Sequence, residues 1–485
     1  MTVPFFNPAD IGLAWPEVLL TLVALVVLCL ECVVPEGRRG WLGELSLLGV
    51  AGAAASLLGQ VGERATGFSG MYVVDPFAVF FKVVFLAATA MTILLAIQYL
   101  RLEGIERGEF YALVLFCTVG MMLMASGGDL LSLWIGLETM SICIYVLVGF
   151  LKADQRSTEA SLKYLLMGAF SSAILLYGIV LLFGVAGSTN LDAIGRALAG
   201  RGLGHPMLVL AVILLTAGLG FKIAAVPFHA YIPDVYEGAP TAVTAFISVG
   251  PKVAGFAMLV RVFLSAIPTE AVNWTALFYV LAILTMTLGN LAAIAQRNVK
   301  RMLAYSSIAH VGYLLIGVVA GGSLGTAALL LYTLAYCFMN LGAFAMVILL
   351  CRETVKGDQL EDFSGLAQVS PVAAAAMLLF LLSLAGVPPT GGFVGKLYLF
   401  GAAIAGQYTW LAVIAVVNSA ISLFYYMRVT MFMYMRDPLP GGLVLSRSRP
   451  LHLALLAAAL GTLVMGVYPG PFVEFALASV VGVVK

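Results

Sequence analysis

Five ionisable side chains lie within or near the start of long apolar stretches of the sequence. They are Glu138 in LSLWIGLETMS, Lys222 in GLGFKIAAVPFH, Lys252 in FISVGPKVAGF, Lys396 in SLAGVPPTGGFVGKLYLF, and Lys163, four residues after Glu159. An ionisable residue at mid-membrane costs about 2.5–3.5 kcal/mol on insertion scales, so it persists where function or pairing compensates. Burial lowers the pKa of a lysine and a nearby carboxylate raises it again, so a lysine between these influences can load and release a proton. The set therefore predicts a proton relay, in which ionisable side chains are joined by water.

Each candidate also has a structural interpretation. Glu159 and Lys163 form an i,i+4 pair, which is an ordinary stabilising arrangement at a helix start. Glu138 could be the fixed partner of a lysine, which is compatible with a relay. Long lysine stems can also extend toward lipid headgroups, an alternative that applies to Lys222, Lys252 and Lys396.

Two histidines are possible intermediates. His229 follows Lys222 by seven residues, so the two would share a face if the helix were unbroken. His310 has Ser306, Ser307 and Tyr313 at helical spacing. A lone histidine on an apolar helix is as readily a hydrogen-bonded structural residue, and both interpretations stay open.

The elements that position these residues are membrane spans. Of 485 residues, 62% are hydrophobic and 10% charged, and the net charge of +1 gives no basis for nucleic-acid binding. A span needs about 20 apolar residues, and fourteen such runs occur. They lie near 14–35, 42–61, 77–99, 110–127, 129–151, 160–186, 207–230, 240–266, 273–295, 302–320, 326–350, 371–402, 408–434 and 451–469. The segment after Pro469 is short and is expected at the interface. No linker is long enough to release a soluble domain, so we predict one all-α polytopic transmembrane domain over 1–485.

Basic residues orient the predicted spans. The odd-numbered connections carry fourteen of them: Arg38, Arg39, Arg101, Arg107, Lys152, Arg156, Arg297, Lys300, Arg301, Arg352, Lys356, Arg436, Arg447 and Arg449. The even-numbered ones carry four: Arg64, Arg196, Arg201 and Arg261. By the positive-inside rule the odd connections face the cytoplasm and both termini face outward. The connection from Asp234 to Ala239 is an exception with two acids and no base, and its acids are interpreted as a solvated loop.

Proline and glycine interrupt two of the predicted spans. Freed backbone groups persist at membrane depth only when buried in protein or facing a water-filled cavity. Interruptions at matching positions in two halves are typical of inverted-repeat transporters. We predict N-terminal helices over 1–109, five-helix repeats over 110–266 and 273–434, and a C-terminal helix and tail over 451–485. Helices 7 and 12 are then the broken ones, the fourth of each repeat, and they carry Lys222 and Lys396 beside Pro227, Pro233, Pro388, Pro389, Gly391 and Gly392.

Three stretches resemble the antiporter-like subunits of respiratory complex I, the proton-translocating NADH-quinone oxidoreductase. They are GFKIAAVPFHAYIPDVYEGAPTAVTAFISVGPKVAGF at 220–256, NVKRMLAYSSIAHVGYLL at 298–315 and SLAGVPPTGGFVGKLYLF at 383–400. The run PDVYEGAP is similar to the subunit N type. Lys396 differs from the glutamate typical of subunit M, and fourteen spans without a long lateral helix differ from subunit L.

The resemblance implies roles for the matching positions. Glu138 and Lys222 would form the ion pair of an input half-channel, Lys252 the central connection and Lys396 the output. The remaining matches are Lys163 in the sixth span, and His229 and His310 along the hydrated axis.

The resemblance also implies partners and a location. The chain shows no phosphate-binding loop, dinucleotide fingerprint or cysteine set for iron–sulfur clusters. We therefore expect NADH, FMN, iron–sulfur clusters and quinone to bind in partner subunits, and we expect no cofactor in this chain. Subunits M and K are the expected neighbours in a bacterial inner membrane. A cation/proton antiporter subunit, a non-pumping structural subunit of the membrane arm, and a hydrogenase-linked homologue are the alternatives.

Overall fold

The computed structural model describes residue 7 and residues 9–199, 205–351, 357–438, 445–446 and 448–480. Basic residues counted above at positions 201, 352, 356 and 447 lie outside these ranges. The α-helices are α1 (Ala9–Leu13), α2 (Trp15–Val33), α3 (Leu42–Leu57), α4 (Pro76–Leu102), α5 (Gly108–Ser126), α6 (Leu130–Val148), α7 (Gln155–Ala186), α8 (Leu191–Leu198), α9 (Pro206–Ile223), α10 (Ile232–Gly238), α11 (Thr241–Leu259), α12 (Trp274–Ile294), α13 (Val299–Ala320), α14 (Gly322–Leu350), α15 (Leu366–Val369), α16 (Pro371–Ala385), α17 (Gly391–Ala405), α18 (Thr409–Met435), α19 (Arg449–Val467) and α20 (Gly470–Val480). A short hairpin pairs β1 (Ala65–Gly67) with β2 (Tyr72–Val74), so that Gly67 faces Tyr72.

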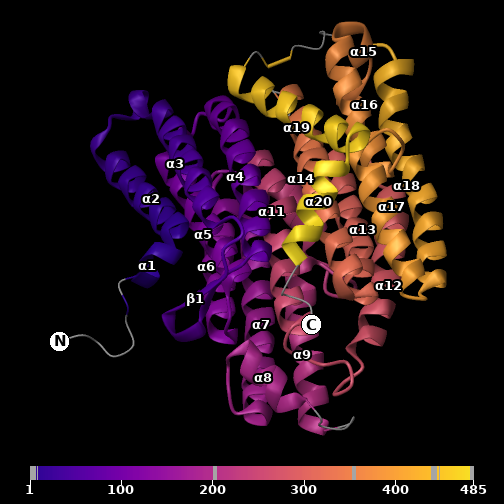
Figure 1. Cartoon of the computed structure of the whole chain (residues 1–485). Helices are drawn as coiled ribbons and strands as arrows, with labels where there is room; N and C mark the ends of the chain where they lie inside the picture. Colours follow the sequence, from indigo (N-terminus) through magenta and orange to yellow (C-terminus); the bar gives the residue numbers. More distant parts are fainter. Residues whose placement is uncertain are drawn as a thin grey trace.

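The described helices confirm the predicted all-α membrane fold. Thirteen of them, some with short flanking turns, are long and apolar enough to span a membrane, and they correspond to thirteen of the fourteen predicted runs. The remaining run, 371–402, is divided into the shorter helices α16 and α17. Figure 1 shows the long helices as one bundle, with β1 and α8 at one end and α15 at the other.

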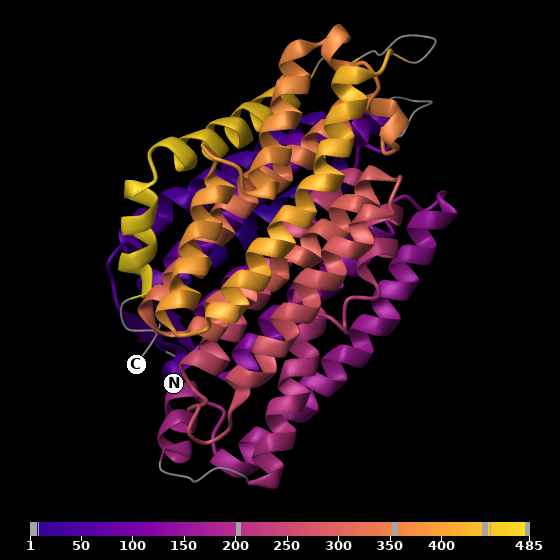
Figure 2. The same ribbon diagram turned by 90° about the vertical axis from the view of Figure 1, so that its right-hand side faces the viewer.

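Helices α11, α13 and α14 form the centre of the bundle. Nearly every residue of their apolar windows is buried. The outer helices α7, α12 and α18 leave large apolar side chains exposed, such as Phe170, Leu284 and Phe424. Figure 2 shows these long helices running side by side. A helix that is apolar all round is stable only inside other protein or lipid, so the residues carried by the three central helices are shielded by this chain itself.

The two five-helix segments use the same close contact between their first two helices. Gly120 on α5 and Gly136 on α6 approach so closely that a Cβ on either would lie within 2.8 Å of the other helix's backbone. In the second segment, Gly289 on α12 and Gly312 on α13 are in the same situation, because a Cβ on either would collide with the backbone of the other helix. Small residues let membrane helices approach closely.

The first break separates α9 from α10. Ala224 ends α9 in the left-handed conformation (φ 66°). The backbone N–H of Val226 then donates to Thr285 Oγ1 of α12 at 3.0 Å. The predicted span 207–230 therefore stops being helical after Ile223. His229 lies past the break, so it does not share a helical face with Lys222.

The second break separates α16 from α17. Gly386 (φ 86°) ends α16, and the N–H of Gly392 donates to Ser383 Oγ at 3.1 Å. Lys396 Nζ donates to the carbonyl groups of Leu384 and Ala385 at 2.9 and 2.8 Å. Each break thus has its freed backbone groups bonded by side chains, as buried non-helical backbone in a membrane requires.

The C-terminal segment crosses the bundle. Figures 1 and 2 both show α19 inclined to the other long helices, after which α20 turns along the bundle. Helix α20 packs on α4 and α14, with the ring of Phe475 at 5.0 Å from that of Phe80. The predicted C-terminal tail is a helix against the bundle up to Val480.

Gly392→Ala is expected to disturb the second break strongly. A Cβ on Gly392 would overlap the carbonyl oxygen of Ser383, so α16 and α17 would have to separate. Overpacking of this kind typically costs about 1–3 kcal/mol. Gly401→Ala on the same helix is the matched control, because no atom lies within 4 Å of its Cβ position. Heat inactivation of the reconstituted protein should begin at a lower temperature for Gly392→Ala only; equal curves for the two variants would contradict this packing.

Candidate proton-relay site

Lys222 lies near the end of α9 with only 3% of its surface exposed. Its Nζ donates to Ser141 Oγ of α6 at 2.7 Å and to Tyr145 OH at 3.4 Å. Glu138, one turn before Ser141, is half-buried and accepts a hydrogen bond from Ser172 of α7. The described residues contain no ion pair within 4.0 Å between Lys222 and Glu138. The expected direct pair is replaced by a contact between the amine and a hydroxyl on the glutamate's own helix.

Lys252 lies at the centre of α11 and is 2% exposed. Pro251 directly precedes it and has no N–H, so the carbonyl of Ile247 loses its helical donor. Tyr236 OH donates to that carbonyl at 3.3 Å. Lys252 Nζ donates to Ser307 Oγ of α13 at 2.6 Å and lies 5.3 Å from the centre of the Tyr236 ring. Within the described chain no carboxylate pairs with this amine.

His310 lies one turn after Ser306 and Ser307 on α13 and is buried, with three tyrosine rings centred 5.1 to 5.9 Å from its own. Its Nδ1 is 2.5 Å from Tyr332 OH, and its Nε2 is 3.3 Å from Tyr426 OH. Tyr426 OH is also hydrogen-bonded to Ser306 Oγ. Lys252 donates to Ser307, one turn before His310, and Lys396 lies beside Tyr313, whose ring centre is 5.7 Å from that of His310. The predicted helical neighbours of His310 are therefore present, and His310 lies between the surroundings of the two lysines.

Lys396 lies six residues into α17, behind the second break, and is 3% exposed. Besides the two carbonyl groups of α16, Nζ donates to Ser419 Oγ of α18 at 2.9 Å. It lies 4.7 Å from the centre of the Tyr313 ring. Tyr313 OH accepts a hydrogen bond from Asn290, whose carbonyl oxygen accepts one from Tyr425. These bonds connect α12, α13 and α18 through polar side chains around Lys396.

The three lysines have similar surroundings. Each is held by hydroxyl or carbonyl oxygens, and each lies beside an aromatic ring. Snorkelling is thereby excluded for all three, because their side chains end inside the protein.

The chain is similar over nearly its whole length to known proteins. The family model described as NADH:quinone oxidoreductase/Mrp antiporter, transmembrane, matches residues 127–422. NADH-quinone oxidoreductase subunit N of Trichlorobacter lovleyi is 44% identical over 98% of both chains. Subunit N 2 of Rhizobium meliloti is 47% identical over 96% of this chain and 97% of its own. The chain belongs to the subunit N family.

Solved structures share the fold of this chain. A chain of respiratory complex I from Thermus thermophilus superposes with a TM-score of 0.81 and 34% identity, over 95% of this chain and 99% of that one. A chain of the archaeal membrane-bound sulfane sulfur reductase gives 0.84 at 25% identity, over 98% of both. The resemblance seen in the sequence is confirmed.

Two of the predicted site residues of this subunit N family member, Lys163 and His229, lie apart from the buried lysines. The side chain of Lys163 is 44% exposed and pairs with Glu159 at 2.7 Å and Asp234 at 3.1 Å. His229 is half-buried, and its Nδ1 has no partner within the described residues. Within the described part of the chain, no hydrogen bond or ion pair joins either residue to Lys222 or Lys252. The i,i+4 interpretation of Lys163 is correct in geometry.

Asp234 and Glu237 do not form the simple solvated loop that we expected. Arg301 of α13 donates to Asp234 at 2.9 Å and to Glu237 at 3.0 Å. Partial burial raises the pKa of Asp234, but hydrogen bonds from Arg301 and Lys163 outweigh burial and hold that pKa below its usual value. The stability that Asp234 gains from Arg301 and Lys163 is therefore fully present at a pH above the ordinary carboxyl pKa. It is lost as the pH falls through the lowered pKa of Asp234 in the folded protein. Glu159, Lys163, Asp234 and Glu237 all border a cavity of about 220 Å³.

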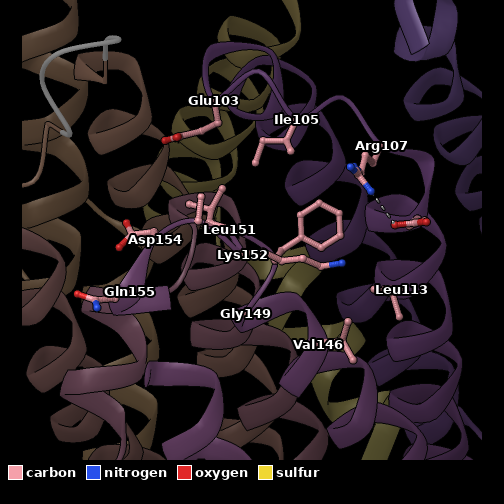
Figure 3. A pocket seen from close by; sticks show the side chains of 13 residues that line it. Glu103, Ile105, Arg107, Leu113, Val146, Gly149, Leu151, Lys152, Asp154 and Gln155 are labelled. Atoms are coloured by element: carbon pink, nitrogen blue, oxygen red, sulfur yellow. Dashed lines mark ion pairs between the residues drawn. The ribbon is translucent and has the colours of Figure 1, made fainter. Parts of the chain in front are cut away.

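A second cavity, of about 680 Å³, opens between the turns that follow α4 and α6 (Figure 3). Arg107 and Glu109 pair across 4.0 Å at its edge, and Lys152 projects from the facing turn. None of the predicted relay residues lines this cavity. It is therefore separate from the buried lysines.

Sequence reasoning missed two buried ion pairs. Lys82 of α4 pairs with Glu17 of α2 at 2.9 Å, and both are almost inaccessible. Arg261, counted as a loop charge, is 6% exposed and binds Asp75 with two bonds of 2.7 and 2.8 Å. The structure therefore corrects the count for the even-numbered connections from four basic residues to three. Lys82 stands inside the run 77–99, so the rule that found Lys222 also applied to it.

Proposed function

We propose that this chain is a proton-translocating membrane subunit of an NADH-quinone oxidoreductase, driven by redox chemistry in partner subunits. Protons would pass along Glu138, Lys222, Lys252, His310 and Lys396. Lys163 and His229 would connect the route to water, since the side chains of both are partly exposed. Subunits M and K would be its neighbours in a bacterial inner membrane, with both termini on the periplasmic side.

The observation that carries this proposal is the burial of three lysines without a carboxylate partner among the described residues. Burial disfavours the charged form of an amine, whereas oxygen atoms that accept hydrogen bonds from the amine favour it. The hydroxyl groups of Ser141, Ser307 and Ser419 both donate and accept hydrogen bonds. A proton can therefore leave an amine through such a group or through water beside it, which a metal-binding or purely apolar interior would not permit.

The central lysine gives the direct test. The complex carrying Lys252→Ala, reconstituted in vesicles, is expected to translocate protons about 10²-fold more slowly, because removing one proton-transferring group typically costs a factor of about 10²–10⁴ at the affected step. Ser307→Ala should have a smaller effect in the same direction, since water can replace a hydroxyl. NADH oxidation and vesicle acidification are measured together.

The outcomes separate the rival functions. Unchanged proton stoichiometry with normal assembly in Lys252→Ala would indicate a structural subunit that does not pump. Proton flux that requires Na⁺ and proceeds without NADH would indicate a cation/proton antiporter. The proposal requires NADH-dependent proton translocation that falls in Lys252→Ala.

A further inference from the structure

A buried triad lies outside the two five-helix segments. Glu17 of α2 and Lys82 of α4 form an ion pair at 2.9 Å. Tyr72 of β2 donates to Glu17 Oε1 at 2.7 Å and accepts a hydrogen bond from Lys82 Nζ at 2.7 Å. Glu17 is 3% exposed, Tyr72 5% and Lys82 0%. Three polar groups are thus enclosed together although none belongs to the route proposed above.

One atom of the triad is unsatisfied. Glu17 Oε2 is buried and has no hydrogen-bond partner among the described residues. Two other buried carboxylates are different: Glu31 uses both oxygens, on Arg39 and on the N–H of Gly108, and Asp75 uses both on Arg261. Removing a carboxylate oxygen from water without a partner is unfavourable, so Glu17 Oε2 is a buried acceptor that can take one more hydrogen-bond donor.

Two more buried polar side chains belong to residues near the triad. Ser126 lies at the end of α5, and the bridge between Tyr72 and Gly127 brings Ser126 alongside Tyr72. Gln60 Oε1 is buried without a partner among the described residues, while the Gln60 amide donates to the carbonyl of Leu13, four residues before Glu17. A buried water typically needs two to four polar partners, and Glu17 Oε2, Ser126 Oγ and Gln60 Oε1 are buried polar atoms that such a water could use.

The position suits exchange with the aqueous side at the hairpin end. Glu17 is the third residue of α2, and Lys82 is the seventh of α4, roughly 10 Å along that helix at 1.5 Å per residue. The hairpin that carries Tyr72 belongs to an even-numbered connection, at the end predicted to face outward. The triad therefore lies within a few turns of that end.

We propose that Glu17, Tyr72 and Lys82 form a second proton-holding site, reached through water from the hairpin end. An excess proton carried by that water as hydronium binds Glu17 at Oε2, which leaves a neutral carboxylic acid and a neutral water, while Lys82 keeps its hydrogen bond to Tyr72; the proton returns to water from the same atom. Lys82 at 2.9 Å repels a metal cation, which restricts the ligand to a proton or a water molecule. The titratable groups in contact with Glu17 are Lys82 and Tyr72, while Ser126 and Gln60 are neutral.

Infrared difference spectroscopy on the reconstituted complex tests this site. Its role in pumping rests on the proposed function, but its protonation is measurable alone, as a carboxylic C=O band between acid and alkaline buffer. That band should vanish in Glu17→Gln and persist in Glu31→Gln, the matched control on the same helix. A band that is the same in Glu17→Gln and the wild type would overturn the proposal.

Two further measurements keep the outcome decisive. If Glu17→Gln does not assemble, Ser126→Ala removes one neighbouring hydroxyl without touching the ion pair and should shift the band; an unshifted band counts against the site. A band that depends on Glu17, together with full proton pumping in Lys252→Ala, would leave this site standing and defeat the proposed relay. The two proposals therefore fail separately.

Discussion

Replacing Lys222 with Ala in the assembled complex is expected to lower NADH-driven proton pumping by about 10²-fold, the lower range for loss of a proton-transferring group. Lys222 is 3% exposed and donates its strongest contact to Ser141, so a methyl group would leave that hydroxyl without its amine. Vesicle acidification per NADH oxidised measures the effect. Lys152→Ala is the control, because this lysine is exposed in the turn after α6 and should have no effect.

Glu138 and Lys222 should act as one unit, because Lys222 donates to Ser141, which lies one turn after Glu138 on α6. We expect Glu138→Ala to reduce pumping strongly, and the double variant with Lys222→Ala to be little worse than either single one, since residues of one network are not additive. Ser141→Ala distinguishes the bridged geometry from a direct pair. If Ser141→Ala pumps normally while Glu138→Ala does not, the hydroxyl contact has no role. Full pumping in both Lys222→Ala and Glu138→Ala would defeat the assignment.

The second large effect is expected on stability. Arg261→Ala leaves Asp75 buried without its partner, and breaking a buried ion pair in this way costs about 3–5 kcal/mol. Arg261 also donates to the carbonyl of Ala125 at 3.0 and 2.9 Å, so the variant loses contacts to both α4 and α5. The amount of subunit in the assembled membrane complex, and its heat inactivation, should both fall markedly.

A double substitution distinguishes the cost of leaving Asp75 charged and unpaired from the loss of the contact between Asp75 and Arg261. Replacing both residues with apolar ones, Asp75→Leu with Arg261→Met, removes the stranded charge and should recover part of the loss. Arg39→Ala is the comparison, because its partner Glu31 keeps the hydrogen bond from Gly108. Equal assembly of Arg261→Ala and wild type would show that this pair does not hold the helices together.

The fold was predictable because membrane spans depend on local properties. The length of each apolar run gave the span, and Pro227 and Pro389 lie close to the two breaks, since proline lacks the N–H that a helix needs to continue its hydrogen bonds. The burial of Lys222 and Lys252 followed from their distance from the ends of their runs, whereas Lys396 is nearer the end of its own. These features need no knowledge of which helices are neighbours.

The partners of the charged groups were not predictable in the same way. Arg261 and Asp75 are 186 residues apart, and an arginine at the end of an apolar run has the same local sequence whether it lies in a loop or a buried pair. Lys222 was expected to reach Glu138 directly, but the rotation of α6 presents Ser141. Side-chain contacts of this kind depend on helix packing, which a single sequence does not encode locally.

The three buried lysines have no carboxylate beside them among the described residues, and this limits how many of them can carry a proton at the same time. Within the described part of the chain, a proton on Lys252 has no carboxylate partner to offset it, and Lys252 is bonded to Ser307, one turn before His310. Two adjacent sites filled at once would repel each other across a medium that screens poorly. If protons follow the proposed route, filled and empty positions would therefore alternate along it, so that each arriving proton displaces the one ahead of it.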